Sequence, residues 1–407
     1  MNSSKFQNLR SAIESYYSEA FSPEIVNAIE FVENIELQGK IIAKFLEVGG
    51  KGSSSVKAAV SGFQTTLLDI ERQFKEAIGS LKLGKDHIVF IDGVDIRPDD
   101  IDFDTYIECI KGLANAVWSL NLDYFAKIRD SKGRIKVVLL LRPDIFDKIK
   151  FHNSNAKMRD NSVVLDWKTT YSDYRTSRIY RLADNLLGKQ QKIGRELKLG
   201  EGWEHYFNYK IVNYRIAERL DDPFIGFLRY SFYRPRDVIS YLDILKKYVE
   251  EHRPSGDVFT DKDFTNCQQA YSDYLLGEVK DYLGFYHSEA NFDELTGFFR
   301  FMHGRSRFSW REFTGAFREH SLSLRNRILT ISELQEGPEQ LLQFLYSMNV
   351  VGYDEFVDEK SGNFAHWCFR DRTAVVLNPK IPPNLGAANE KPYSVHPGLV
   401  RALKLGK

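Results

Sequence analysis

An acidic residue ends a short apolar run near residue 90, where it could bind a metal ion. The run Ile88-Val-Phe-Ile91 is followed directly by Asp92 and, after Gly-Val, by Asp95. An apolar run without polar alternation is typical of a strand buried on both faces, and the carboxyl ends of such strands bind ligands in open α/β sheets. Asp92 is therefore a candidate Mg²⁺ ligand, and Asp95 a candidate to orient an attacking water. An acidic turn that merely ends a strand would give the same pattern.

An arginine follows the second apolar run of the chain. This run spans residues 135–141, and Arg142 comes directly after it. At the end of the strand that follows a metal-binding acid, an arginine could contact the γ-phosphate of a nucleotide or the nucleotide of a neighbouring subunit. It could equally pair with Asp92, Asp95 or Asp144 and so end the strand, and the spacing favours neither interpretation.

Two further arginines, Arg234 and Arg236, flank Pro235 at the start of an expected helix. Proline at the first helical position and Asp237 in the first turn are typical of a helix start. Arginines beside that start could also reach phosphate, as arginines of a lid domain do. The candidate nucleotide-binding residues are therefore Arg142, Arg234 and Arg236.

The sequence contains no intact phosphate-binding loop of the form G-x-x-x-x-G-K-[ST]. Residues 79–85 come close, but Asp86 stands where a hydroxyl should bind Mg²⁺, and the segment follows a helix and enters a strand, the reverse of the usual order. Residues 49–55 have a better context, but their lysine precedes the last glycine. We expect the true loop to lie upstream of the chain. A core without the strand before that loop would leave edges unpaired, so we expect an upstream segment or residues 36–48 to lie between the two apolar strands.

Other polar clusters are better explained as structure. Acidic residues alternate over 100–104 like the start of a calcium loop, but Thr105 replaces the turn glycine and Lys111 the bidentate glutamate, so we expect them to start a helix. A basic and aromatic group further along could meet phosphates, although a solvated helix start explains it better; its members are His303, Arg305, Arg307, Trp310 and Arg311.

Composition and charge exclude several classes of protein. The chain has 407 residues, of which 43% are hydrophobic and 28% charged, values that exclude a disordered or fibrous protein and suggest two or three domains. It carries 56 Lys and Arg against 56 Asp and Glu, so no overall charge favours nucleic acid. No apolar run approaches the roughly 18 residues of a membrane helix, and we expect no membrane association. Three widely spaced cysteines and an N-terminus unlike a signal peptide favour a cytoplasmic protein.

The apolar patterns predict the elements that position these residues. We expect strands at 87–91 and 135–141 with a helix over 103–129 between them, and a weaker third strand at 163–167. Strand, helix and strand in this order are typical of a parallel α/β sheet. Helices are expected to precede this part, within residues 1–47 and over 56–78.

The second half of the chain is predicted to be mainly helical up to about residue 335. A helix over 339–349 and two β-like runs, 350–357 and 364–370, then follow. Together with an earlier helix near 309–319 they form the outline of a winged helix. The expected recognition helix over 338–349 contains no Lys or Arg, so we expect this domain to pack against protein and not to read DNA bases.

The order of these motifs resembles a family of predicted bacterial P-loop ATPases, sometimes called FunZ-like and akin to the KAP and STAND NTPases. The motifs that carry the resemblance are Ile-Asp-Gly-Val-Asp (91–95), Leu-Leu-Arg-Pro-Asp-Ile-Phe (140–146), Val-Leu-Asp-Trp (164–167), Arg-Pro-Arg-Asp-Val-Ile (234–239) and Tyr-Ser-Val-His-Pro-Gly-Leu (393–399). The resemblance covers residues 85–407. It implies that Asp92 is the Walker B acid with Asp95 beside it, that Arg142 and Arg236 are nucleotide sensors, and that ATP and Mg²⁺ are the cofactors.

We therefore predict an α/β plus mainly α protein in three parts. They are a P-loop NTPase-like parallel core with N-terminal helices over 1–185, a helical lid over 186–300, and a winged-helix-like domain over 301–407. The predicted function is that of an ATP-dependent switch or remodelling module, which would hydrolyse ATP if the phosphate-binding loop is supplied upstream, and whose partners are a nucleotide and a protein or a second copy. The alternative is a non-catalytic scaffold or DNA-binding regulator that retains a degenerate NTPase fold.

Overall fold

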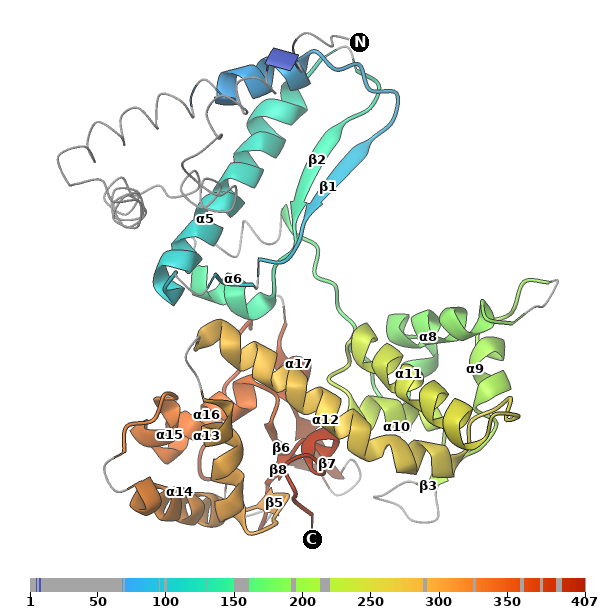
Figure 1. The fold of residues 1–407 in the computed structure, drawn as a ribbon, viewed down its shortest axis with the longest axis vertical. Coiled ribbons are helices and arrows are strands. Elements are labelled where there is room, and N and C mark those ends of the chain that lie inside the picture. Colours follow the sequence, from blue (N-terminus) through green and yellow to red (C-terminus); the bar gives the residue numbers. More distant parts are fainter. Residues whose placement is uncertain are drawn as a thin grey trace. The chain divides into compact units, whose positions relative to one another are not determined.

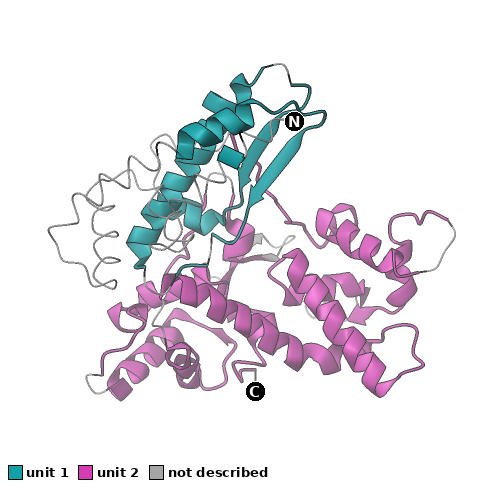
Figure 2. Ribbon diagram, turned by 45° about the horizontal axis from the view of Figure 1, so that its top comes forward, with its two compact units in different colours: residues 1–154 teal, residues 155–407 magenta. Residues whose placement is uncertain are grey.

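The structure is a computed structural model in which contacts divide the chain into two compact units, residues 1–154 and 155–407 (Figure 2). The described residues are 5, 7–8, 68, 70–94, 96–98, 101–129, 131–149, 161–191, 195–212, 220–287, 291–324, 327–358, 362–373, 376–385 and 390–406. The helices expected within residues 1–47, and most of the helix expected over 56–78, lie outside these ranges. The described part of the latter is helical over 70–79, as predicted.

Unit 1 contains a parallel pair of strands joined by a helix (Figure 1). Strand β1 (His87–Ile91) leads to helix α5 (Phe103–Ser119), which is followed by strand β2 (Ile135–Leu139) and helix α6 (Pro143–Ile149). Asp102 begins α5 by accepting a hydrogen bond from the Thr105 amide, so the acidic residues before this helix cap it, as predicted.

Strands β1 and β2 pair directly with each other. Their parallel register sets Val89 opposite Val137 and Ile91 opposite Leu139. The expectation that another segment lies between these strands is therefore wrong. A single helical crossover such as α5 is the ordinary connection between two adjacent parallel strands, and it brings β2 directly beside β1 here.

A side chain occupies the other edge of β2. The Leu140 amide donates to the Ile91 carbonyl, so even-numbered residues of β2 face β1 and Val137 faces the opposite edge. There the carboxamide of Asn121 donates to the Val137 carbonyl (2.8 Å) and accepts from the Val137 amide (2.9 Å). Asn121 lies in a π-helical turn, Leu120–Tyr124, that continues α5. It replaces a neighbouring strand at this point of the edge.

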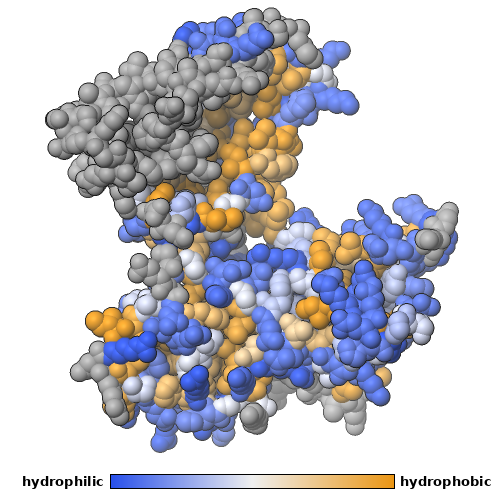
Figure 3. All heavy atoms as spheres, in the orientation of Figure 1, coloured by the Kyte–Doolittle hydropathy of each residue, from blue (hydrophilic) through white to orange (hydrophobic). Residues whose placement is uncertain are grey.

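The apolar side chains of β1 are exposed to solvent on both faces of the strand. Ile88, Val89 and Phe90 are 51–61% exposed, and apolar side chains gather over this sheet in Figure 3. The expected burial of this strand on both faces is wrong for the described residues, because they supply one neighbouring strand and not a complete sheet. The expected third strand is also wrong: residues 163–167 form no strand, and Val163 and Leu165 are exposed.

Unit 2 begins as a group of helices around an aromatic core. The helices are α8 (Arg178–Gly188), α9 (Glu201–Tyr206), α10 (Pro223–Tyr230), α11 (Pro235–His252) and α12 (Asp261–Tyr286), with a short antiparallel pair of strands, β3 (Ile211–Val212) and β4 (Leu220–Asp221). Large rings fill the space between them: Trp203 stacks on Phe207, and Tyr241 stacks on Tyr271, each with ring centroids 4.1 Å apart. Such pairs combine large apolar burial with a defined geometry.

The remainder of unit 2 combines helices with a four-stranded sheet. The helices are α13 (Phe292–Phe298), α14 (Trp310–Leu324), α15 (Glu333–Glu336), α16 (Pro338–Ser347) and the short α17 (Cys368–Asp371). The strands pair antiparallel in the order β5 (Arg307–Phe308), β8 (Tyr393–Val395), β6 (Val351–Asp358) and β7 (Gly362–His366). The predicted helix and the two β-like runs after it are thus confirmed as α16, β6 and β7, with β7 ending four residues before the predicted limit.

The fold as a whole is mixed α/β, mainly helical, with small sheets. The predicted division at residue 185 falls within α8, and the division at residue 300 falls within a 3₁₀ turn, Phe299–Met302. Cys109, Cys267 and Cys368 are buried and form no disulfide. None of the helices in the described ranges combines the length and apolar character needed to span a bilayer.

Close helix packing in unit 2 yields a first prediction. A Cβ at Gly202 would lie 2.4 Å from the Asp184 carbonyl oxygen and 2.8 Å from the Gly188 amide nitrogen, so Gly202→Ala should force α9 away from α8 and cost about 1–3 kcal/mol of unfolding free energy. Gly277, within α12, has open space around the same position. Gly277→Ala should stabilise the chain by about 0.5–1 kcal/mol because alanine favours the helix. Urea unfolding of both variants measures the difference, and equal effects would contradict the packing of α8 against α9.

Candidate functional site

Asp92 lies directly after β1 at the carboxyl end of the strand. Its Oδ1 accepts a hydrogen bond from the Gly93 amide (2.8 Å), and its side chain is otherwise exposed. Gly93 has φ +82°, a left-handed conformation that glycine adopts without strain, so the chain turns sharply here and leaves the carboxylate accessible. Asp95 lies outside the described residues.

Arg142 reaches the same edge of the sheet from the neighbouring strand. Because Ile91 and Leu139 are register partners, the residues that follow the two strands, Asp92 and Arg142 among them, lie at one edge. Arg142 forms a bidentate ion pair with Asp144, with Nε–Oδ1 and Nη2–Oδ2 distances of 3.2 and 2.6 Å. Arg142 therefore pairs with a nearby acid, which is one of the two interpretations that the sequence left open.

The residues considered as a phosphate-binding loop do not form one where they are described. Residues 79–85 run from the end of a helix through an irregular segment toward β1, which is the reverse of the strand-to-helix order that points amide groups at phosphate. The glycine-rich segment 49–55 lies outside the described residues.

Asp92 alone supplies too few ligands for a metal ion that is bound only by protein side chains, but one carboxylate is enough for Mg²⁺ that is bound together with a nucleotide. Within the described ranges, no group of three or more His, Cys, Asp or Glu side chains could hold a metal ion. Mg²⁺ bound with nucleotide takes one or two carboxylates and completes its shell with phosphate oxygens and water. Asp92 at the edge of the sheet fits that requirement.

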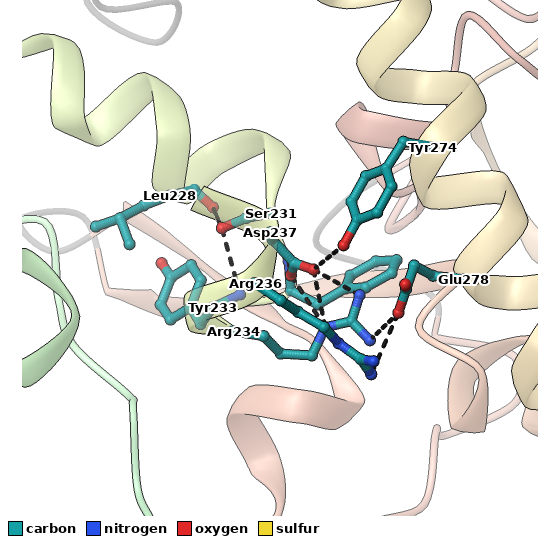
Figure 4. Close-up of polar contacts among 9 residues, drawn as sticks. Leu228, Ser231, Tyr233, Arg234, Arg236, Asp237, Tyr274 and Glu278 are labelled. Carbon is teal, nitrogen blue, oxygen red and sulfur yellow. Dashed lines mark hydrogen bonds and ion pairs between the residues drawn. The ribbon is translucent and has the colours of Figure 1, made fainter. Parts of the chain in front are cut away.

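Arg234 lies in unit 2 and is held by a fully buried carboxylate (Figure 4). Its Nε and Nη2 donate to Asp237 at 2.6–3.1 Å, and the side chain of Asp237 has no exposed surface. Asp237 also accepts from the Phe232 amide (2.9 Å) and the Tyr274 hydroxyl (3.4 Å). Burial by itself would lower the pKa of Arg234, but the charges of Asp237 and Glu278 raise it, so the guanidinium stays charged.

Arg234 and Arg236 converge on one carboxylate oxygen of α12. Oε2 of Glu278 accepts from Nη1 of Arg234 at 2.9 Å and lies 3.2 Å from Nη2 of Arg236 (Figure 4). The side chain of Arg236 is 63% exposed, whereas that of Glu278 is 16% exposed. Arg236 is thus the more accessible of the two arginines, and Arg234 is the more firmly fixed.

The turn that carries these arginines is strained and packed against the last part of the chain. Tyr233 has φ +58°, an uncommon conformation for a bulky residue, and it is buried. Its ring contacts Phe369 (5.1 Å between centroids), and Phe232 contacts His396 (4.8 Å). His396 is buried and caps the following turn, Pro397–Leu399, by accepting a hydrogen bond from the Gly398 amide.

The chemistry-bearing residues therefore form two groups, one in each unit. Asp92 and Arg142 share an edge of the unit 1 sheet, and Arg234 and Arg236 share Glu278 in unit 2. The sequence indicates Asp237 only as a helix-start residue, and it gives no sign of the roles of Glu278 in unit 2 or of Asn121 at the edge of β2. Asp237 in the first turn of α11 was a detectable signal, but the contacts of Glu278 and Asn121 depend on tertiary packing.

Comparisons with known proteins gave no match. No protein-family profile matches the chain, and no similar curated protein and no similar solved structure was found. The assignment of a function therefore rests on the residues and geometry described above.

The buried pair of Arg234 and Asp237 yields the second prediction. Asp237→Asn should lower the unfolding free energy by about 3 kcal/mol, because it removes the charge that compensates a largely desolvated guanidinium. Asp243→Asn is the matched control, because Asp243 lies on the same helix and pairs with Lys247 at an exposed site, where the loss should stay below about 0.5 kcal/mol. Chemical denaturation compares the two. A loss for Asp237→Asn no greater than that of the control would contradict the structural role of Asp237.

Proposed function

We propose that unit 1 contributes the metal-binding edge of a P-loop type nucleotide site and that the protein acts as an ATP-dependent switch or remodelling module. The observation that carries the proposal is that β1 and β2 are parallel, so that Asp92 and Arg142, which follow their carboxyl ends, lie at one sheet edge. In open α/β sheets this edge binds ligands. The order of motifs over residues 85–407 supports the same assignment. The direct pairing of the two strands departs from the P-loop core expected from the sequence, in which another strand lies between them.

The proposed roles follow from the chemistry of each side chain. Mg²⁺, when bound with ATP, would neutralise charge on the phosphates. Asp92 would bind that ion through its exposed carboxylate, and Asp95 would orient water. Arg142 would contact phosphate in place of Asp144. In unit 2, Arg236 is the candidate for a contact with phosphate, and Arg234 would fix the turn that carries it.

A second candidate function, a non-catalytic scaffold, is favoured by a specific observation. Arg142, Arg234 and Arg236 each already pair with a carboxylate, namely Asp144, Asp237 and Glu278. Arginines that are neutralised in this way can serve the fold alone, as in a degenerate NTPase whose shape is retained without turnover. The two functions differ in whether the chain responds to Mg²⁺ and ATP.

We further propose that the end of unit 2 is a winged-helix-like domain that binds protein. Helix α16 followed by the β6–β7 hairpin supports this assignment, with β8 inserted between β5 and β6 as a departure from the simplest form. Three of the basic residues beside α14 pair with acids, since His303 contacts Glu319, Arg305 contacts Glu312 and Arg307 contacts Asp354. These pairs reduce the charge available for a phosphate backbone.

The nucleotide site yields the third prediction. Without a complete phosphate-binding loop the chain should bind ATP weakly, because backbone amides and the loop lysine supply most phosphate contacts. Ligand-observed NMR detects such weak binding, and the affinity for ATP should be higher in the presence of Mg²⁺ than in the presence of EDTA. Asp92→Asn should remove this increase because it removes the metal ligand.

Asp123→Asn is the control, since Asp123 is an exposed acid of the same unit and should leave the Mg²⁺ effect unchanged. If Asp92→Asn retains the full Mg²⁺ effect, the metal site is not at Asp92. If the unsubstituted chain shows no Mg²⁺-dependent binding of ATP, the scaffold function is favoured instead.

The C-terminal domain yields the fourth prediction. Helix α16 carries one acid and no basic residue, so the chain should bind duplex DNA weakly at physiological salt and without sequence preference. Fluorescence anisotropy at low and physiological salt measures this affinity. Submicromolar binding that falls steeply with salt would contradict the prediction and favour a nucleic-acid function.

A further inference from the structure

A histidine of the β6–β7 hairpin lies between two carboxylates that come from different elements. His366 is the last residue of β7, and its Nδ1 lies 3.1 and 3.0 Å from the two carboxylate oxygens of Asp371, which ends α17. Its Nε2 lies 2.9 Å from Oε2 of Glu355 on β6. The hydroxyl of Tyr346, on α16, donates to the same Asp371. The imidazole thus joins the hairpin to the short helix that follows it.

The protonation state of this ring follows from its contacts. An ionised carboxylate only accepts hydrogen bonds, whereas a neutral imidazole donates at one nitrogen and carries a lone pair at the other. Only the charged imidazolium can therefore donate to Glu355 and to Asp371 at the same time. Loss of the proton would turn a lone pair toward one of the two carboxylates and would remove one of two charge-assisted hydrogen bonds.

The surroundings of His366 also favour the charged ring. Burial by itself would lower the pKa of His366, but the hydrogen bonds to Asp371 and Glu355 and the charges of these residues raise it. The ring of Tyr353, the residue opposite His366 on β6, stacks on the imidazole with centroids 4.5 Å apart. Burial raises the pKa of Tyr353 to about 12, so this neighbour stays uncharged near neutral pH.

Further titratable or charged side chains stand on the elements around the ring. They include Tyr346, Asp354, Cys368, Arg370 and Tyr393. Asp354 is paired with Arg307 at 2.8 Å, and the guanidinium of Arg370 lies over the ring of Phe364. Burial raises the pKa values of Tyr346 and Tyr393, and the Cys368 thiol is buried. Within the network of Tyr346, Glu355, His366 and Asp371, the histidine is therefore the group that changes charge near neutral pH.

We propose that His366 is a proton-dependent latch: the protonated ring fastens the β6–β7 hairpin to α17, and loss of the proton weakens this attachment. Helix α17 also carries Phe369 and Arg370, which lie against the ring of Tyr233 in the strained turn. A rise in pH would therefore loosen the hairpin from the helix that contacts this turn. The latch lies wholly within unit 2, and the proposal does not depend on the nucleotide site proposed for unit 1.

Hydrogen–deuterium exchange of the complete chain between about pH 6 and about pH 9 tests the latch. A raised pKa in the fastened state stabilises that state fully below the ordinary pKa of histidine, and the stabilisation is lost as the pH rises through the raised value. Exchange in peptides covering residues 362–372, corrected for its intrinsic dependence on pH, should therefore rise at least about threefold over this range. In His366→Gln this rise should be absent. His303→Gln is the control, because His303 pairs with Glu319 at an exposed site, and it should retain the full rise.

Glu355→Gln provides a second variant, at a position whose side chain is 61% exposed. The glutamine amide can donate to the lone pair of a neutral ring, so the rise should be smaller than in the unsubstituted chain. No rise in the unsubstituted chain, or an equal rise in His366→Gln, overturns the proposal. If His366→Gln does not fold, an undiminished rise in Glu355→Gln overturns it as well. NMR on ¹³C-labelled imidazole rings measures the pKa of His366 directly, and a value at or below the ordinary pKa of histidine would also contradict the latch.

Discussion

The buried ion pair between Asp237 and Arg234 is the interaction on which the candidate site in unit 2 depends. A carboxylate without exposed surface must be compensated by charge and hydrogen bonds, and Asp237 obtains both from residues on either side of it in the chain, Arg234 and the Phe232 amide. These bonds close a tight turn and hold Tyr233 in an unfavourable backbone conformation. Strain of this kind persists where surrounding contacts fix it, and here the rings of Phe369 and His396 do so from the end of the chain.

One consequence is that the turn connects three parts of unit 2. Its arginines face Glu278 on α12, its aromatic residues face the C-terminal segment, and Pro235 starts α11. In unit 1 the candidate site is the sheet edge. There the carboxylate of Asp92 is exposed, whereas the guanidinium of Arg142 is paired with Asp144.

Much of the local structure could be predicted from the sequence, because it depends on local signals. Apolar runs located β1 and β2, Pro235 located the start of α11, and a helix followed by two β-like runs located α16 and the hairpin. The layers and neighbours of these elements could not be predicted. The apolar composition of β1 suggested burial, yet burial depends on strands and helices elsewhere. Likewise, strand β8 is three residues long and pairs with residues far away in sequence, and the role of Glu278 arises from the packing of α12 against the start of α11.

The central claim is that the carboxyl edge of β1 and β2 binds the nucleotide, and hydrogen–deuterium exchange of the complete chain tests it most directly. Amides in a turn that binds a metal–nucleotide complex become less accessible to exchange. The account predicts that MgATP slows exchange in peptides covering residues 88–94 and 138–143, and that ATP with EDTA does so less. Unchanged exchange in both peptides at MgATP concentrations that protect another part of the chain would contradict it.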